Sequence, residues 1–76
     1  MRTIIDVRTV DEFKLSNAIG SINIPLQEIP QKIEEIKKLQ SPIILCCASG
    51  MRSGMALNIL KENGIECENA GSWTNI

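Results

Sequence analysis

The sequence contains no histidine and no tyrosine. Without histidine the chain has no Ser-His-Asp triad, no Cys-His pair and no metal site with a histidine ligand. Phenylalanine and tryptophan occur once each, so aliphatic side chains have to form the core. Eight basic residues against nine acidic ones give a net charge of -1, which argues against nucleic acid or an anionic membrane as the main partner.

Cysteine is also scarce, with three residues, two of them adjacent at positions 46 and 47. No Cys-x-x-Cys spacing occurs, so neither a zinc cluster nor a thioredoxin-like dithiol fits, and no metal or organic cofactor is expected. An odd, sparse set of cysteines indicates thiols kept reduced, and no apolar run matches a signal peptide or a membrane span. We therefore expect a cytoplasmic protein whose 76 residues, 1–76, form one domain.

Strand-like and helix-like segments alternate along the chain. Apolar and β-branched runs predict strands at residues 3–7, 22–24, 42–46 and 65–69, the last of them polar and at a sheet edge. Helical spacing and capping signals predict helices over residues 9–16, with Val10 and Phe13 facing inward, and 29–39, and a third that ends at Gly64. This order predicts a small α/β domain with a parallel sheet of about four strands flanked by helices.

The segment after the third predicted strand has the features of an anion site. A cysteine that directly follows that buried strand is succeeded by three small residues, Ala48, Ser49 and Gly50, and then by the start of a helix. Backbone N–H groups in such a loop can converge on one point, and the helix N-terminus adds partial positive charge. A thiolate at the base of the loop would have a lowered pKa without any histidine base.

Two spacings compete for the nucleophile in this loop. Cys46, five residues and then Arg52-Ser53 match the Cys-x5-Arg-Ser/Thr spacing of tyrosine phosphatases and related arsenate reductases. Cys47, four residues and then Arg52 match the shorter Cys-x-x-Gly-x-Arg-Ser form of sulfurtransferases, with Gly50 at the glycine position. Phosphoester cleavage usually needs a general acid, whereas sulfite leaves thiosulfate as a stable anion. We favour Cys47 and keep Cys46 as the alternative.

Four blocks of the sequence resemble a rhodanese domain in the family's order: IIDVRTVDEF, SNAIGSINIPLQEI, PIILCCASGMRSGMALNILKENGIE and NAGSW. The resemblance covers nearly the whole chain, although Asn17 stands where the family usually has a histidine. It implies a three-layer rhodanese-like fold, shortened at both ends, with Cys47 as the nucleophile of a sulfurtransferase that carries a persulfide. The loop that would hold the terminal sulfur consists of Ala48, Ser49, Gly50, Met51, Arg52 and Ser53.

The same resemblance implies a thiosulfate-like small molecule as the sulfur donor, and a thiol, cyanide or a protein as the acceptor. Among the supporting residues, Arg52 either holds the anionic substrate or pins the loop by pairing with Glu12 or Asp6. Asp6 lies in an apolar strand and is expected to accept hydrogen bonds from loop or helix-start amides. Arg8 is expected to line the mouth of the site or to pair at the surface with Glu12 or Asp11.

A non-catalytic rhodanese-like module that docks a partner or senses redox state is a second alternative. Such modules typically lack the cysteine, so the presence of Cys47 weighs against it. Cys46 is expected to be a small buried side chain on the strand face opposite Cys47, and Trp73 to cover the small core. We expect a monomer or a weakly self-associating chain.

Overall fold

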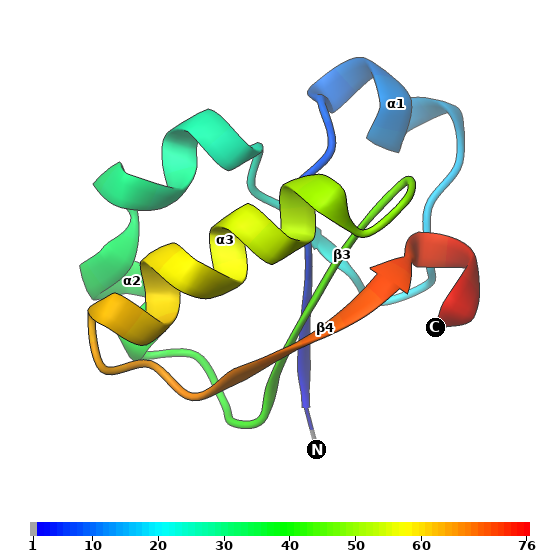
Figure 1. The fold of residues 1–76 in the computed structure, drawn as a ribbon. Coiled ribbons are helices and arrows are strands. Elements are labelled where there is room, and N and C mark those ends of the chain that lie inside the picture. Colours follow the sequence, from blue (N-terminus) through cyan, green and yellow to red (C-terminus); the bar gives the residue numbers. More distant parts are fainter. Residues whose placement is uncertain (1) are drawn as a thin grey trace.

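The computed structural model describes residues 2–76, which contain a four-stranded sheet and its helices (Figure 1). The elements, with η for a 3-10 helix, are β1 (Thr3–Asp6), α1 (Val10–Leu15), β2 (Ile22–Asn23), η1 (Leu26–Gln31), α2 (Ile33–Lys37), β3 (Ile43–Cys47), α3 (Met51–Glu62), β4 (Cys67–Ser72) and η2 (Trp73–Asn75). The strand order is β2-β1-β3-β4, and all three pairs are parallel. The predicted α/β class is confirmed. Within the described residues, no helix has both the length and the apolar character needed to cross a bilayer.

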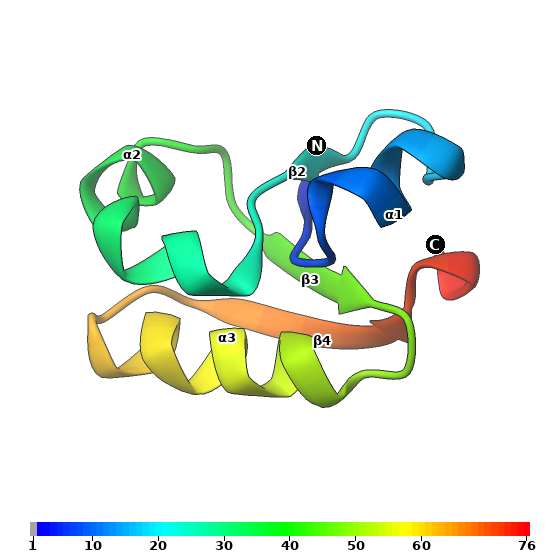
Figure 2. The same cartoon turned by 90° about the horizontal axis from the view of Figure 1, so that it is seen from above.

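The two faces of the sheet carry apolar clusters of different size. On one face, η1, α2 and α3 (Figure 2) enclose the main core cluster, whose fully buried members include Ile5, Ile29, Ile36, Leu45, Ala56 and Leu60. On the other face, Ile4, Ile44 and Cys46 form a smaller cluster covered in part by Trp73, as expected for that tryptophan. Successive residues of a strand point to opposite faces, so Cys47 belongs to the main cluster and Cys46 to the small one.

Helix α1 is held by its cap rather than by apolar packing. The predicted capping box is present, because the Glu12 N–H donates to Thr9 Oγ1 at 3.2 Å and the Thr9 N–H donates to Glu12 Oε1 at 3.0 Å. The prediction that Val10 faces inward is wrong, since its side chain is 45% exposed. With only six residues and none of them buried, α1 lies across the carboxyl end of the sheet instead of packing on the core.

The helix predicted over residues 29–39 is split into η1 and α2. Pro30 inside η1 lacks the N–H that a continuous α-helix needs, and the chain leaves helical geometry at Lys32, where φ is -110°. The apolar stripe itself is confirmed, because Ile29 and Ile36 are fully buried and Ile33 packs against the same cluster.

Strand β4 forms an edge of the sheet, as predicted, but begins two residues later than expected. Its register with β3 shifts by one residue, because Leu45 pairs with Asn69 while Cys46 pairs with Gly71. Ala70 is therefore the extra residue of a bulge. This bulge lies next to the last two residues of β3, so it brings the end of β4 beside the loop that follows Cys47.

Candidate active site

Cys47 is the last residue of β3, and its sulfur lies at the N-terminus of α3. The intervening loop of residues 48–50 stands at the carboxyl end of the sheet, near α1 (Figure 1). Gly50 precedes α3 with φ of 103°, a left-handed conformation that glycine adopts without steric penalty. The Gly50 N–H donates to Cys47 Sγ at 3.0 Å and the Ser53 N–H does so at 3.4 Å. The sulfur thus accepts from N–H groups that the start of a helix otherwise leaves unpaired.

These donors make Cys47 an acidic thiol. Burial by itself raises the pKa of Cys47, but hydrogen bonds from the Ser53 hydroxyl and from the Ser53, Gly50 and Ser49 N–H groups outweigh it, and the pKa falls from 9.0 to about 7. The partial positive charge at the start of α3 acts in the same direction. About half of Cys47 is therefore thiolate at neutral pH, although the side chain has no exposed surface (0%).

Cys46 lies in the opposite environment. Its side chain is also fully buried, among the apolar residues of the other sheet face. Burial and then the negative charge of Asp6 raise the pKa of Cys46 to about 11, so it stays a neutral thiol at physiological pH. The geometry therefore favours Cys47 over Cys46 as the nucleophile.

The loop residues predicted to hold the substrate differ in exposure. Ala48, Ser49 and Met51 are exposed, and the Met51 side chain is 73% accessible at the start of α3. Gly50 is half-buried and Ser53 is fully buried behind the sulfur. The surface of the loop next to the buried Cys47 therefore consists of the small residues Ala48 and Ser49 and the large apolar side chain of Met51.

Arg52 is paired with Glu12 and so ties the start of α3 to α1. Its Nη1 and Nη2 groups donate to the two carboxylate oxygens of Glu12 at 2.7 and 3.1 Å, and both side chains are about one-third exposed. The Arg52 hydrogen bond, followed by that of the Thr9 N–H, lowers the pKa of Glu12 from 4.5 to about 2. This arrangement corresponds to the role in which Arg52 pins the loop by pairing with Glu12, and not to the role in which it holds the substrate.

Arg8 does not line the mouth of the site, and its expected pairing with Glu12 or Asp11 is wrong. The side chain is 5% exposed and its Nε and Nη2 groups donate to the Asp6 carboxylate at 2.8–3.0 Å. Nη2 also donates to the Ser16 carbonyl at 2.7 Å, and the guanidinium lies 4.8 Å from the centre of the Trp73 ring. Asp6 accepts the Arg8 N–H as well, as expected for a loop amide. This buried pair fastens α1 and the tryptophan to the end of β1.

Asn69, within β4, is a residue of this site that was not predicted from the sequence. Its Oδ1 accepts a hydrogen bond from the Ser53 hydroxyl at 2.6 Å, and its Nδ2 donates to the Gly50 carbonyl at 3.1 Å. The available signal was positional, because a polar residue near the carboxyl end of a strand that pairs with β3 lies at the same sheet edge as Cys47.

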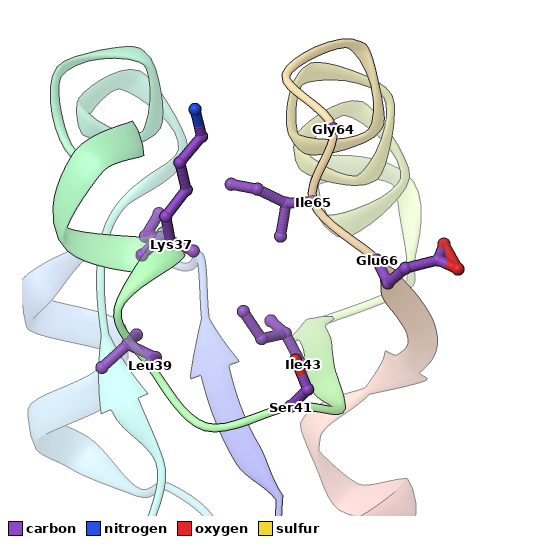
Figure 3. Close-up of a pocket in the computed structure, with 8 residues that line it drawn as sticks. Lys37, Leu39, Ser41, Ile43, Gly64, Ile65 and Glu66 are labelled. Carbon is purple, nitrogen blue, oxygen red and sulfur yellow. The ribbon is translucent and has the colours of Figure 1, made fainter.

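A hollow of about 220 Å³ lies at the other end of the sheet, away from this sulfur (Figure 3). Apolar and polar residues line it together, with Ile43 and Ile65 on its inner surface and Lys37 at its rim. The Glu66 carboxylate points outward, away from Ile65. The hollow has no cysteine among its lining residues, and the hydrogen-bonded thiol lies at the opposite end of the sheet, so the candidate site is the loop around Cys47.

Comparison with known proteins matches residues 1–75 to the family model of the rhodanese-like domain. The chain belongs to the rhodanese-like family. The predicted resemblance is thereby confirmed. A solved structure described as a rhodanese with anions from E. coli supports the same assignment, with a TM-score of 0.87 and 33% identity over all of this chain and 92% of that one.

Two curated relatives of this rhodanese-like chain are bacterial. The thiosulfate sulfurtransferase PspE of Escherichia coli (strain K12) is 35% identical over 74 residues, which cover 95% of this chain and 71% of PspE. The uncharacterized protein YqhL of Bacillus subtilis (strain 168) is 39% identical over 61 residues, which cover 80% of this chain and 48% of YqhL. The rhodanese-like chain thus aligns with about half the length of YqhL.

Proposed function

We propose that this rhodanese-like domain is a sulfurtransferase that moves a sulfane sulfur from a small anionic donor such as thiosulfate to a thiophilic acceptor, through a persulfide on Cys47. The observation that carries the proposal is the set of N–H donors from Gly50 and Ser53 directed at Cys47 Sγ. The similarity to PspE, named a thiosulfate sulfurtransferase, supports the reaction class.

In the first half-reaction the Cys47 thiolate attacks the outer sulfur of thiosulfate. The S–S bond of thiosulfate breaks, sulfite leaves with the electron pair, and Cys47 becomes a persulfide anion. Sulfite is a stable anion, so its departure needs no general acid, which agrees with a chain that has no histidine. The fixed N–H groups of the loop stabilise the negative charge before and after the transfer.

In the second half-reaction an acceptor nucleophile attacks the outer sulfur of the persulfide. The bond between the two sulfurs breaks and Cys47 leaves as a thiolate. A thiol of low pKa is the better leaving group, so the donors that lower the pKa of Cys47 assist this step as well.

Access to the sulfur requires a local rearrangement. Because Cys47 has no exposed surface, a donor reaches Sγ only after neighbouring atoms have moved. Ala48 and Ser49 are exposed and lie outside any helix or strand, so they are the loop residues that can move most easily. The outer sulfur of the persulfide would then occupy the centre of the loop and accept the N–H bonds that Sγ receives in the unloaded protein.

Intact-mass spectrometry after incubation with thiosulfate tests the proposal. We expect the wild-type protein to gain the mass of one sulfur atom, and cyanide to remove it as thiocyanate. The chain offers a matched pair of variants, because Cys46 and Cys47 are adjacent and equally buried. Cys46→Ser should retain the added sulfur and Cys47→Ser should lose it.

Two results would overturn this function. The first is a wild-type protein that remains unmodified by thiosulfate, or a sulfur atom that persists in Cys47→Ser. The second is hydrolysis of p-nitrophenyl phosphate that is lost in Cys46→Ser and retained in Cys47→Ser, which would establish the Cys-x5-Arg chemistry instead.

A further inference from the structure

The Asn69 side chain connects the edge strand β4 to both main donors of the sulfur site. Its Nδ2 group donates to the Gly50 carbonyl at 3.1 Å, and its Oδ1 accepts from the Ser53 hydroxyl at 2.6 Å. Oδ1 also accepts from the Gly71 N–H at 2.9 Å. Figures 1 and 2 both show the end of β4 beside the loop between β3 and α3.

The three contacts fix which way the amide faces. Gly71 offers a donor and Gly50 an acceptor, so only one orientation of the Asn69 amide satisfies both. Oδ1 is therefore held toward Ser53. The backbone of β4 thus orients Asn69, and Asn69 in turn binds the carbonyl of Gly50 and the side chain of Ser53, the two residues whose N–H groups donate to the sulfur.

The Ser53 hydroxyl has a single proton and two acceptors within reach. Its contact with Asn69 Oδ1 is 2.6 Å and its contact with Cys47 Sγ is 3.4 Å, so the shorter and stronger bond is the one to Asn69. The N–H groups of Gly50 and Ser53 are thus the donors that stay on the sulfur regardless of where the hydroxyl proton lies.

The loop and β4 also meet without any side chain between them. A Cβ atom on Gly50 would stand 3.2 Å from the Gly71 Cα. This close approach lets an asparagine of β4 reach the Gly50 carbonyl, and the bulge at Ala70 places Asn69 and Gly71 on either side of the extra residue.

We infer that Asn69 is a positioning residue of the sulfur site, which holds the Gly50 and Ser53 N–H donors on Cys47 from the edge of the sheet. Asn69 touches neither the sulfur nor any reacting atom in this arrangement, so it acts through the loop. The inference rests on the proposed function in taking Cys47 as the sulfur carrier, but its test needs no sulfur donor.

The test is the pH dependence of iodoacetamide alkylation at Cys47, followed by peptide mass spectrometry. In Asn69→Ala, we expect the apparent pKa of Cys47 to rise by about one pH unit, which is about a fivefold loss of thiolate at pH 7. Asn69 lies exposed at the sheet edge, so the variant should fold, and thermal unfolding monitors this.

The matched control is Asn63→Ala at the other end of α3. Asn63 Nδ2 donates to the Ile59 carbonyl at 2.8 Å, so this variant loses a comparable amide–carbonyl bond on the same helix, far from the sulfur. It should leave the alkylation profile of Cys47 unchanged. A purely structural role of Asn69 would move both variants alike in stability and neither in the pKa.

A double variant separates the two contacts of Asn69. Against a Ser53→Ala background, Asn69→Ala should still raise the pKa of Cys47, because the link to the Gly50 carbonyl is lost there as well. An unchanged pKa in folded Asn69→Ala would overturn the inference. A lowered pKa would overturn it too, since Asn69 would then only compete with sulfur for the Ser53 proton.

Should Asn69→Ala fail to fold, Asn69→Ser decides, with Asn63→Ser as its control, since neither substitution adds a charge. The serine lacks the Nδ2 group that donates to the Gly50 carbonyl, so the pKa of Cys47 should rise only in Asn69→Ser. An equal profile in the two serine variants would refute the inference. Failure of thiosulfate loading, with the alkylation results as expected, would refute the proposed function alone.

Discussion

Cys46 and Cys47 are neighbours in the chain and neither has any exposed surface, yet burial raises the pKa of Cys46 to about 11 while hydrogen bonding overcomes burial and lowers that of Cys47 to about 7. Cys46 packs among Ile4, Ile44 and Trp73, near the negative charge of Asp6. Cys47 faces the first N–H groups of α3. The comparison indicates that hydrogen-bond donors, from the Ser53 hydroxyl and from the loop backbone, and not solvent exposure, make one of two adjacent thiols acidic.

The largest expected effect is the difference in alkylation rate between the two thiols. At pH 7 about half of Cys47 but only about one part in ten thousand of Cys46 is thiolate. A thiolate of lower pKa is the weaker nucleophile, so iodoacetamide should modify Cys47 about a hundredfold faster. Peptide mass spectrometry over a pH series measures both sites in one protein. Comparable rates at pH 7 would break the comparison, because both side chains are equally covered.

Arg8→Ala should destabilise the Cys46 side of the sheet. It leaves the fully buried Asp6 carboxylate without its bidentate partner, which costs about 3 kcal/mol or more in the free energy of unfolding. Since the Arg8 charge lowers the pKa of Cys46, its removal should also raise that pKa and widen the gap to Cys47. Urea unfolding measures the first effect, and Arg2→Ala, at an exposed arginine, is the control. A loss as small as that of Arg2→Ala would contradict the buried pair.

Ser53→Ala should have a moderate effect on Cys47 alone. It removes the hydroxyl at 3.4 Å from Sγ but keeps the Ser53 N–H, so the thiolate fraction near pH 7 should fall about threefold. The same alkylation series measures it, and Cys46 serves as the internal reference. A tenfold or greater fall would mean that the hydroxyl, rather than the backbone, dominates the acidity of Cys47.

The smallest expected effect comes from Glu12→Gln. The pKa of Glu12 is lowered from 4.5 to about 2 in the folded protein, chiefly by Arg52, so its stabilising contribution is present above pH 4.5 and is lost as the pH falls toward 2. The wild type should therefore lose stability in this window, and Glu12→Gln should lose less. The difference is small because the pair is partly exposed. Thermal unfolding at pH 6 and pH 3 measures it, with Glu34→Gln as a surface control.

Local signals predicted the parts of this fold that local interactions build. The capping box of Thr9 and Glu12 depends on residues three positions apart, and a continuous run of apolar residues predicts the buried strand β3. The identity of Cys47 as the nucleophile stays a prediction, now with donors around it that are consistent with the role. The Arg8 partner was missed because the pairing with Asp6 depends on how the chain turns after β1.

The contact of β4 with the sulfur site through Asn69 could not be predicted from local sequence patterns. Asn69 reaches the loop because a bulge at Ala70 shifts the register between two distant strands, and no hydrophobic pattern marks such a bulge. Likewise, α1 is too short to bury Val10, which its helical spacing alone did not reveal. Both the position of Asn69 and the exposure of Val10 depend on how segments far apart in the chain pack, which local patterns do not describe.

The spacing between the loop and the edge strand depends on the absence of a side chain at Gly50. Gly50 and Gly71 both have positive φ, and a Cβ atom on Gly50 would stand 3.2 Å from the Gly71 Cα. A methyl group at Gly50 would therefore push the strand and the loop apart and move the Asn69 amide away from the Gly50 carbonyl. The chemistry of the sulfur is thus sensitive to bulk at a site that carries no functional group at all.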